Sequence, residues 1–113
     1  MTFDEYQTAA RRTTNPALND RDRVLDAAAG LSEEAGELLG LLRKRAFQAR
    51  EVPEAALREE LGDALWCLAI TADALGLRLE EVATANITKL ERRHRDGLTQ
   101  GRQPEDSSRP SAR

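Results

Sequence analysis

The sequence has little material for covalent catalysis. It contains one cysteine and one histidine in 113 residues. The lone Cys67 cannot form an internal disulfide, which suits a reducing compartment, so we expect a cytoplasmic protein. His94 and Cys67 have no evident activating partners, so a covalent intermediate is not expected. Glu91-x-x-His94 resembles half of a di-iron carboxylate site, but such bundles need two of these motifs.

Aromatic residues, long apolar runs and basic blocks are also scarce. Aromatics make up 4% of the chain, and no apolar run approaches membrane-spanning length. The N-terminal segment does not resemble a signal peptide. The net charge is −3, and no basic block interrupts the body of the chain. We therefore expect neither a membrane nor a nucleic acid as partner.

The residues that dominate are alanine, leucine, glutamate and arginine, a helix-forming composition. Apolar spacing and capping signals predict an all-α, four-helix-bundle-like fold, with a short N-terminal helix followed by three longer ones. The expected helices cover residues 3–14, 19–48, 53–75 and 79–97. Residues 1–97 then form one domain, and 98–113 a flexible C-terminal tail. The apolar content of 40% is thin for a lone chain, so we expect a homodimer or homotetramer.

Two carboxylate pairs stand out within the second and third expected helices. Glu34 and Glu37 form one pair, and Glu60 and Asp63 form the other; each has i, i+3 spacing, which puts both members on one helix face. A short connection favours antiparallel neighbours, so the four carboxylates would converge. Such a group repels itself unless a cation lies within it, and oxygen ligands suit Mg²⁺ first, with Mn²⁺ possible. Taken singly, each motif is more typical of a solvated face.

Polar residues also follow one face of the fourth expected helix. Asn86, Lys89 and Arg93 recur at spacings of three and four, and would bind phosphates and a sugar. The alternative from spacing alone is that Lys89 and Arg93 pair with the acidic helices. Lys44 is a further phosphate-binding candidate. Trp66 lies one turn after Asp63, where it either stacks on a nucleobase or packs in the core.

The ordered combination resembles a known family. Glu33-Glu34-Ala35-Gly36-Glu37, followed by Glu60-Leu61-Gly62-Asp63, is similar to the signature of the MazG-like nucleotide pyrophosphohydrolases, in the all-α NTP pyrophosphatase superfamily. The resemblance covers roughly residues 3–97 and continues through the Asn86, Lys89 and Arg93 line. It implies that Glu34, Glu37, Glu60 and Asp63 hold Mg²⁺ and that Glu33 is an accessory acid that positions a water or a second ion.

The implied reaction is hydrolysis of a nucleoside triphosphate between its α- and β-phosphates, giving a monophosphate and pyrophosphate. The alternative is a non-catalytic helical interaction module whose acidic faces are solvated. That alternative gives no reason for the glycine inside each acidic motif, Gly36 and Gly62. A glycine in a helix suggests close helix approach or space beside a ligand. Base and sugar preference is left open by the sequence.

Overall fold

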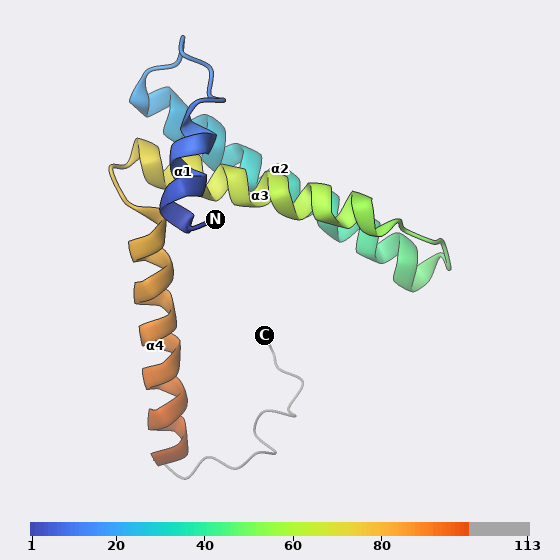
Figure 1. The fold of residues 1–113 in the computed structure, drawn as a ribbon. Helices are drawn as coiled ribbons and strands as arrows, with labels where there is room; N and C mark the ends of the chain where they lie inside the picture. Colours follow the sequence, from blue (N-terminus) through green and yellow to red (C-terminus); the bar gives the residue numbers. More distant parts are fainter. Residues whose placement is uncertain (100–113) are drawn as a thin grey trace. The chain divides into compact units, whose positions relative to one another are not determined.

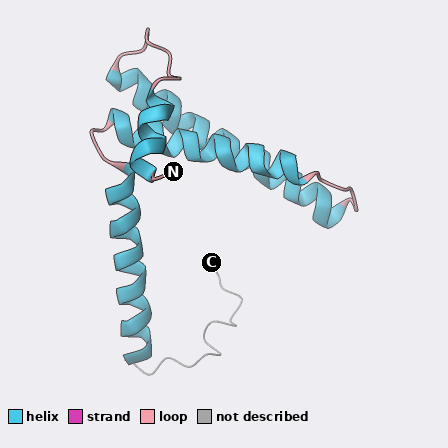
Figure 2. Ribbon diagram, viewed as in Figure 1, coloured by secondary structure: helices cyan, strands magenta, loops and turns pink. Residues whose placement is uncertain are grey.

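The computed structural model describes residues 1–99; residues 100–113, which hold most of the expected tail, lie outside the described residues. The described chain contains four helices and no strand, as Figure 2 shows. The helices are α1 (Phe3–Arg11), α2 (Asp20–Phe47), α3 (Glu54–Ala74) and α4 (Leu79–Thr99) (Figure 1). The all-α fold with a short N-terminal helix and three longer ones is confirmed. No helix within residues 1–99 is both long and apolar enough to cross a membrane.

Local capping sets where the first two helices begin. Thr2 and Glu5 form a capping box at α1: the Glu5 N–H donates to Thr2 Oγ1 at 3.0 Å, and the Thr2 N–H donates to Glu5 Oε1 at 2.7 Å. At α2, Asn19 Oδ1 accepts from the Asp22 N–H at 2.9 Å. Both caps satisfy N–H groups that have no partner within the helix.

Two helix ends have clear chemical causes. The C-terminus of α3 is closed by Gly76 at φ +74°, with the Leu77 N–H bonded to the Ala72 carbonyl at 2.8 Å. The first helix ends at Arg11, earlier than the residue 14 expected from the sequence. Thr13 contributes to this early end, because its hydroxyl donates back to the Ala10 carbonyl at 2.7 Å.

The chain forms two compact units, Met1–Glu80 and Glu81–Arg113, and each is described by itself. In the first unit, α2 and α3 lie side by side and run in opposite directions (Figure 1). The short helix α1 packs on α3, near the end of the hairpin where α3 finishes. This arrangement brings the middle of α2 beside the first half of α3, which is where the two acidic motifs lie. The second unit contains the rest of α4, a single continuous helix to Thr99.

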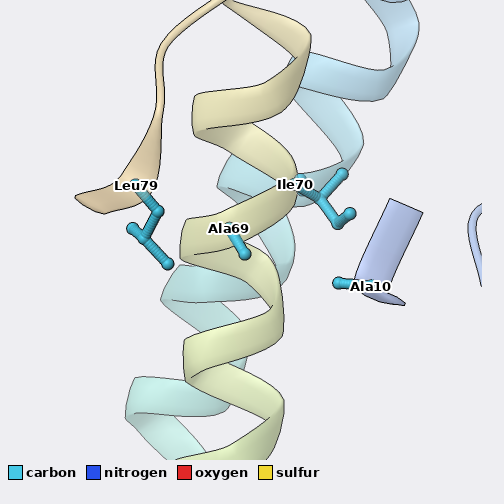
Figure 3. Close-up of a cluster of buried hydrophobic side chains, with 5 residues drawn as sticks. Ala10, Ala69, Ile70 and Leu79 are labelled. Carbon is cyan, nitrogen blue, oxygen red and sulfur yellow. The ribbon is translucent and has the colours of Figure 1, made fainter. Parts of the chain in front are cut away.

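The core of the first unit is small. Its buried cluster brings together residues from all three helices and from the start of α4, four of which Figure 3 labels: Ala10, Ala69, Ile70 and Leu79. Ile70 is the largest fully buried side chain among the described residues. Tyr6, Leu65 and Trp66 pack around this cluster. Since alanines bury little apolar area, packing alone stabilises this unit modestly.

A buried amide joins α1 to the segment that enters α4. The Gln7 side chain is 4% exposed. Its Nε2 donates to the Leu77 carbonyl at 2.9 Å, and its Oε1 accepts from the Leu79 N–H at 2.9 Å. Gln7 therefore satisfies backbone groups that the turn after α3 leaves unpaired.

An ion-pair network fastens the same end of the hairpin. Asp73 on α3 accepts from Arg11 Nε at 2.9 Å and from Arg23 at 3.2 Å. Its carboxylate is 10% exposed. The hydrogen bonds from Arg11 lower the pKa of Asp73 more than its partial burial raises it. The network thus joins α1, α2 and α3 through one carboxylate.

We expect Gln7→Leu to destabilise the protein by about 2 to 4 kcal/mol, because it leaves a buried N–H and a buried carbonyl unpaired. Urea unfolding followed by circular dichroism, at equal protein concentration, measures the change. Gln48→Leu is a matched control at an exposed position and should change the unfolding free energy by less than about 0.5 kcal/mol. Equal losses in both variants would show that the Gln7 hydrogen bonds do not matter.

Candidate metal centre

Three glutamates meet between α2 and α3. Glu34 and Glu37 lie one turn apart on α2, and Glu60 faces them from α3. Each offers a carboxylate oxygen, and these oxygens all lie within 4.8 Å of one another. Glu34 and Glu60 are half-buried, whereas Glu37 is exposed. The structure therefore brings together three of the four carboxylates expected to hold a metal ion; we call them the glutamate cluster.

The electrostatics of the glutamate cluster favour a positively charged occupant. The pKa of Glu60 is raised from its ordinary value of 4.5 to about 7. The largest cause is hydrogen bonding with Glu37 and then Glu34, which favours the protonated acid; partial burial and the repulsion of two like charges add to it. One oxygen each of Glu34 and Glu60, Oε2 in both, is buried with no hydrogen-bond partner. Close, desolvated and unpaired carboxylate oxygens suit a hard divalent cation.

Asp63, the fourth expected ligand, is one turn from Glu60 but lies outside the group of oxygens within 4.8 Å. It lines a neighbouring pocket of about 320 Å³, together with Glu34 and Glu33. Asp63 also lies near Tyr6 of α1. Partial burial of Tyr6 is the largest cause that raises the pKa of its hydroxyl, and the negative charge of Asp63 raises it further. Three glutamates therefore form the close cluster, and Glu34 is shared between this cluster and the pocket that Asp63 lines. Metal binding by these residues stays a prediction.

The pocket has a mixed lining from α2 and α3. Its residues are Asp26, Ala29, Gly30, Glu33, Glu34, Asp63, Trp66 and Cys67. Cys67 is buried. Its burial is the largest cause that raises the pKa of its thiol, and the negative charges of Glu34 and Asp63 raise it further. A thiol held in its protonated form is a poor nucleophile, which agrees with the absence of an activating partner in the sequence.

Trp66 belongs both to the pocket and to the edge of the core. It lines the pocket and also packs against the buried cluster. Its indole Nε1 donates to Thr13 Oγ1 at 2.8 Å, which fixes the orientation of the ring. The two readings of Trp66 offered by the sequence are therefore compatible, because one part of the ring packs inward while another lines the pocket.

The predicted phosphate-binding residues are distributed over both units. Asn86, Lys89 and Arg93 lie on α4 in the second unit, and their side chains are exposed. Lys44 is exposed on α2, seven residues after Glu37, and does not line the acidic pocket. Their roles in substrate binding stay predictions.

The glycines of the hairpin differ in what they do. A Cβ added at Gly30 would meet Cys67 Sγ at 3.0 Å, so Gly30 permits close approach of α2 and α3. A Cβ at Gly36 or Gly62 would meet nothing within 4 Å in this chain. The glycines inside the acidic motifs therefore do not serve helix packing within one subunit.

Sequence reasoning missed Asp26, whose side chain is part of the pocket wall. Asp26 precedes Glu33 by seven residues, two helical turns, which places the two carboxylates on the same face of α2. The seven-residue spacing therefore indicates from sequence that Asp26 lies on the same helix face as Glu33. Asp26 stands in an alanine-rich stretch apart from Glu33-Glu34-Ala35-Gly36-Glu37, so the acidic motif alone does not include it.

An all-α chain with carboxylates gathered between two antiparallel helices is the arrangement that the family resemblance implies. The MazG nucleotide pyrophosphohydrolase domain matches residues 24–98, and the chain belongs to this family. It is also similar to the Gene 37 protein of Mycobacterium phage L5, with 33% identity over 109 residues that cover 89% of this chain and 96% of the phage protein. No solved structure matches.

The raised pKa of Glu60 makes the stability of the metal-free protein depend on pH. Between about 4.5 and 7 the folded protein holds a proton that the unfolded chain has lost, so stability falls as pH rises through this window. We expect the melting temperature in EDTA to be higher at pH 5.5 than at pH 8, and Mg²⁺ to restore stability at pH 8. Thermal unfolding measures both effects.

Glu60→Gln should flatten this pH dependence, because it removes the titrating group. Glu59→Gln is the matched control: Glu59 is exposed on the same helix and does not belong to the glutamate cluster. The same pH dependence in both variants would contradict the assignment to Glu60.

Proposed function

We propose that this protein is a Mg²⁺-dependent nucleotide pyrophosphohydrolase that acts in the cytoplasm to cleanse or regulate nucleotide pools. Water would add across the bond between the α- and β-phosphates of a ribo- or deoxyribonucleoside triphosphate, giving the monophosphate, pyrophosphate and a proton. The observation that carries the proposal is the glutamate cluster, with two buried and unpaired oxygens, in a chain of the MazG family.

Glu34, Glu37 and Glu60 would hold Mg²⁺ or Mn²⁺, with Asp63 contributing from one turn away on α3. When bound, the ion would offset the charge of the triphosphate and polarise its phosphoryl oxygens. Glu33, on the pocket side of the cluster, would help to position the attacking water, and a carboxylate of the site would accept its proton. Asn86, Lys89, Arg93 and Lys44 would bind the phosphates and sugar, and Trp66 the base.

Exposed leucines on the hairpin support the expectation of a homodimer or homotetramer. Leu39 on α2 is 59% exposed, and Leu61 on α3 is 55% exposed. Both leucines lie beside the acidic motifs. A second copy of the chain that covered them would therefore also exclude water from the site. A drier site strengthens each electrostatic interaction within it.

The direct test is incubation with Mg²⁺ and a panel of standard, deoxy and oxidised nucleoside triphosphates, followed by detection of pyrophosphate. We expect release from at least one substrate, and none in excess EDTA. No release from any triphosphate would contradict the proposal and favour the non-catalytic interaction module.

Glu37→Gln and Asp63→Asn should each lower kcat by at least about 100-fold, because each removes a charged oxygen that the reaction needs. Circular dichroism should show an unchanged helical content, since Glu37 and Asp63 are both exposed. Glu59→Gln should retain activity. Rates like those of the unmodified protein in both test variants would remove these residues from the mechanism.

A further inference from the structure

One carboxylate in the pocket has no part in the proposed chemistry. Asp26 lines the pocket, as Glu34 of the glutamate cluster does, and it precedes Glu34 by eight residues on α2. At 1.5 Å per residue, the two residues are about 12 Å apart along the helix axis. That separation is comparable with the length of a nucleoside monophosphate, so phosphates at the glutamate cluster would leave the base near Asp26.

The same end of the pocket has a surface on which a base can stack. Trp66 lines it, and the hydrogen bond from its Nε1 to Thr13 at 2.8 Å fixes the ring. Ala29 also lines the pocket from α2 and carries only a methyl group, which leaves room for a flat ring. Stacking on an aromatic ring holds any base, so it does not by itself select one.

Asp26 supplies the missing selectivity. Asp26 is exposed, and within the described residues its carboxylate makes no hydrogen bond and no ion pair, so its oxygens face solvent and can accept. An ionised carboxylate accepts hydrogen bonds and donates none. It therefore pairs with an amino group on a base edge, as in the contact between a carboxylate and cytosine N4, and it repels the carbonyl oxygen that uracil and thymine present there.

We propose that Asp26 is a specificity residue that selects nucleotides whose base carries an amino group on its pairing edge, and that disfavours uracil and thymine. This inference rests on the proposed function, because it concerns the base of the same substrate. Asp26 contacts the base only and takes no part in hydrolysis.

The matched pair dCTP and dUTP tests the proposal, because cytosine carries an amino group where uracil carries a carbonyl. The two bases also differ at the adjacent N3, which bears a hydrogen only in uracil. We expect kcat/KM with Mg²⁺ to be at least about tenfold higher for dCTP, as for other sites that hydrogen-bond a specific group. Asp26→Asn should bring the two values within about threefold, since an amide can donate as well as accept. Asp22→Asn, an exposed control one turn earlier on α2, should keep the original ratio.

A binding measurement separates this inference from the proposed activity. Trp66 is the sole tryptophan, so its fluorescence reports stacking in the pocket. With Mg²⁺ present to offset the charge of the glutamate cluster, we expect dCMP to quench Trp66 at a lower concentration than dUMP, and Asp26→Asn to remove the difference. Equal titrations in the unmodified protein, no quenching by either, or a ratio unchanged by Asp26→Asn would overturn the role of Asp26. An absence of pyrophosphate release from every triphosphate would overturn the proposed function, and the fluorescence titration would still decide whether Asp26 reads the base.

Discussion

Repulsion between carboxylates on α2 and α3 is the constraint on which the rest of the hairpin depends. Packing of the two helices holds the oxygens of Glu34, Glu37 and Glu60 within 4.8 Å of one another, a distance at which like charges disfavour ionisation. The pKa of Glu60 is raised chiefly by hydrogen bonding with Glu37 and Glu34, and repulsion from these two carboxylates adds to the shift. Either a proton or a divalent cation relieves this repulsion, so the state of the site and the stability of the fold are linked.

The second helix sets the order in which the acidic residues of the site follow one another along its length. Glu37 and Glu34 lie toward its middle, and Asp26 lies nearer its N-terminus, all on a face that α3 partly covers. A helix is a stiff element with a fixed rise, so the distance between the charged end and the Trp66 end of the pocket is set by residue spacing alone. The ion-pair network around Asp73 fastens α1 and α2 to α3 near the Trp66 end. The geometry therefore does not depend on a flexible loop.

Most of the fold could be read from the sequence, and the site only partly. Capping residues such as Thr2 and Asn19 mark helix starts, and Gly76 marks an end, because each effect acts over a few residues. The spacing of Glu34, Glu37 and Glu60 indicated their meeting, since helix periodicity and a short connection fix which faces oppose each other. The position of Asp63 in the wall of the pocket that Glu34 also lines depends on how α3 packs on α2, which periodicity alone does not determine. The pocket that Asp26 lines is formed by the packing of α3 on α2, so the sequence alone does not show it.

The hydrogen bond between Gln7 and Leu79 joins residues that are 72 positions apart. During synthesis on the ribosome, α1 emerges first, but the groups that its amide must satisfy emerge only after both helices of the hairpin have been made. The first helix therefore docks late, as expected for a contact of long sequence separation. A nascent chain that stalled before residue 79 would carry an unsatisfied glutamine and an open core, which are features that quality-control proteases recognise in incomplete proteins.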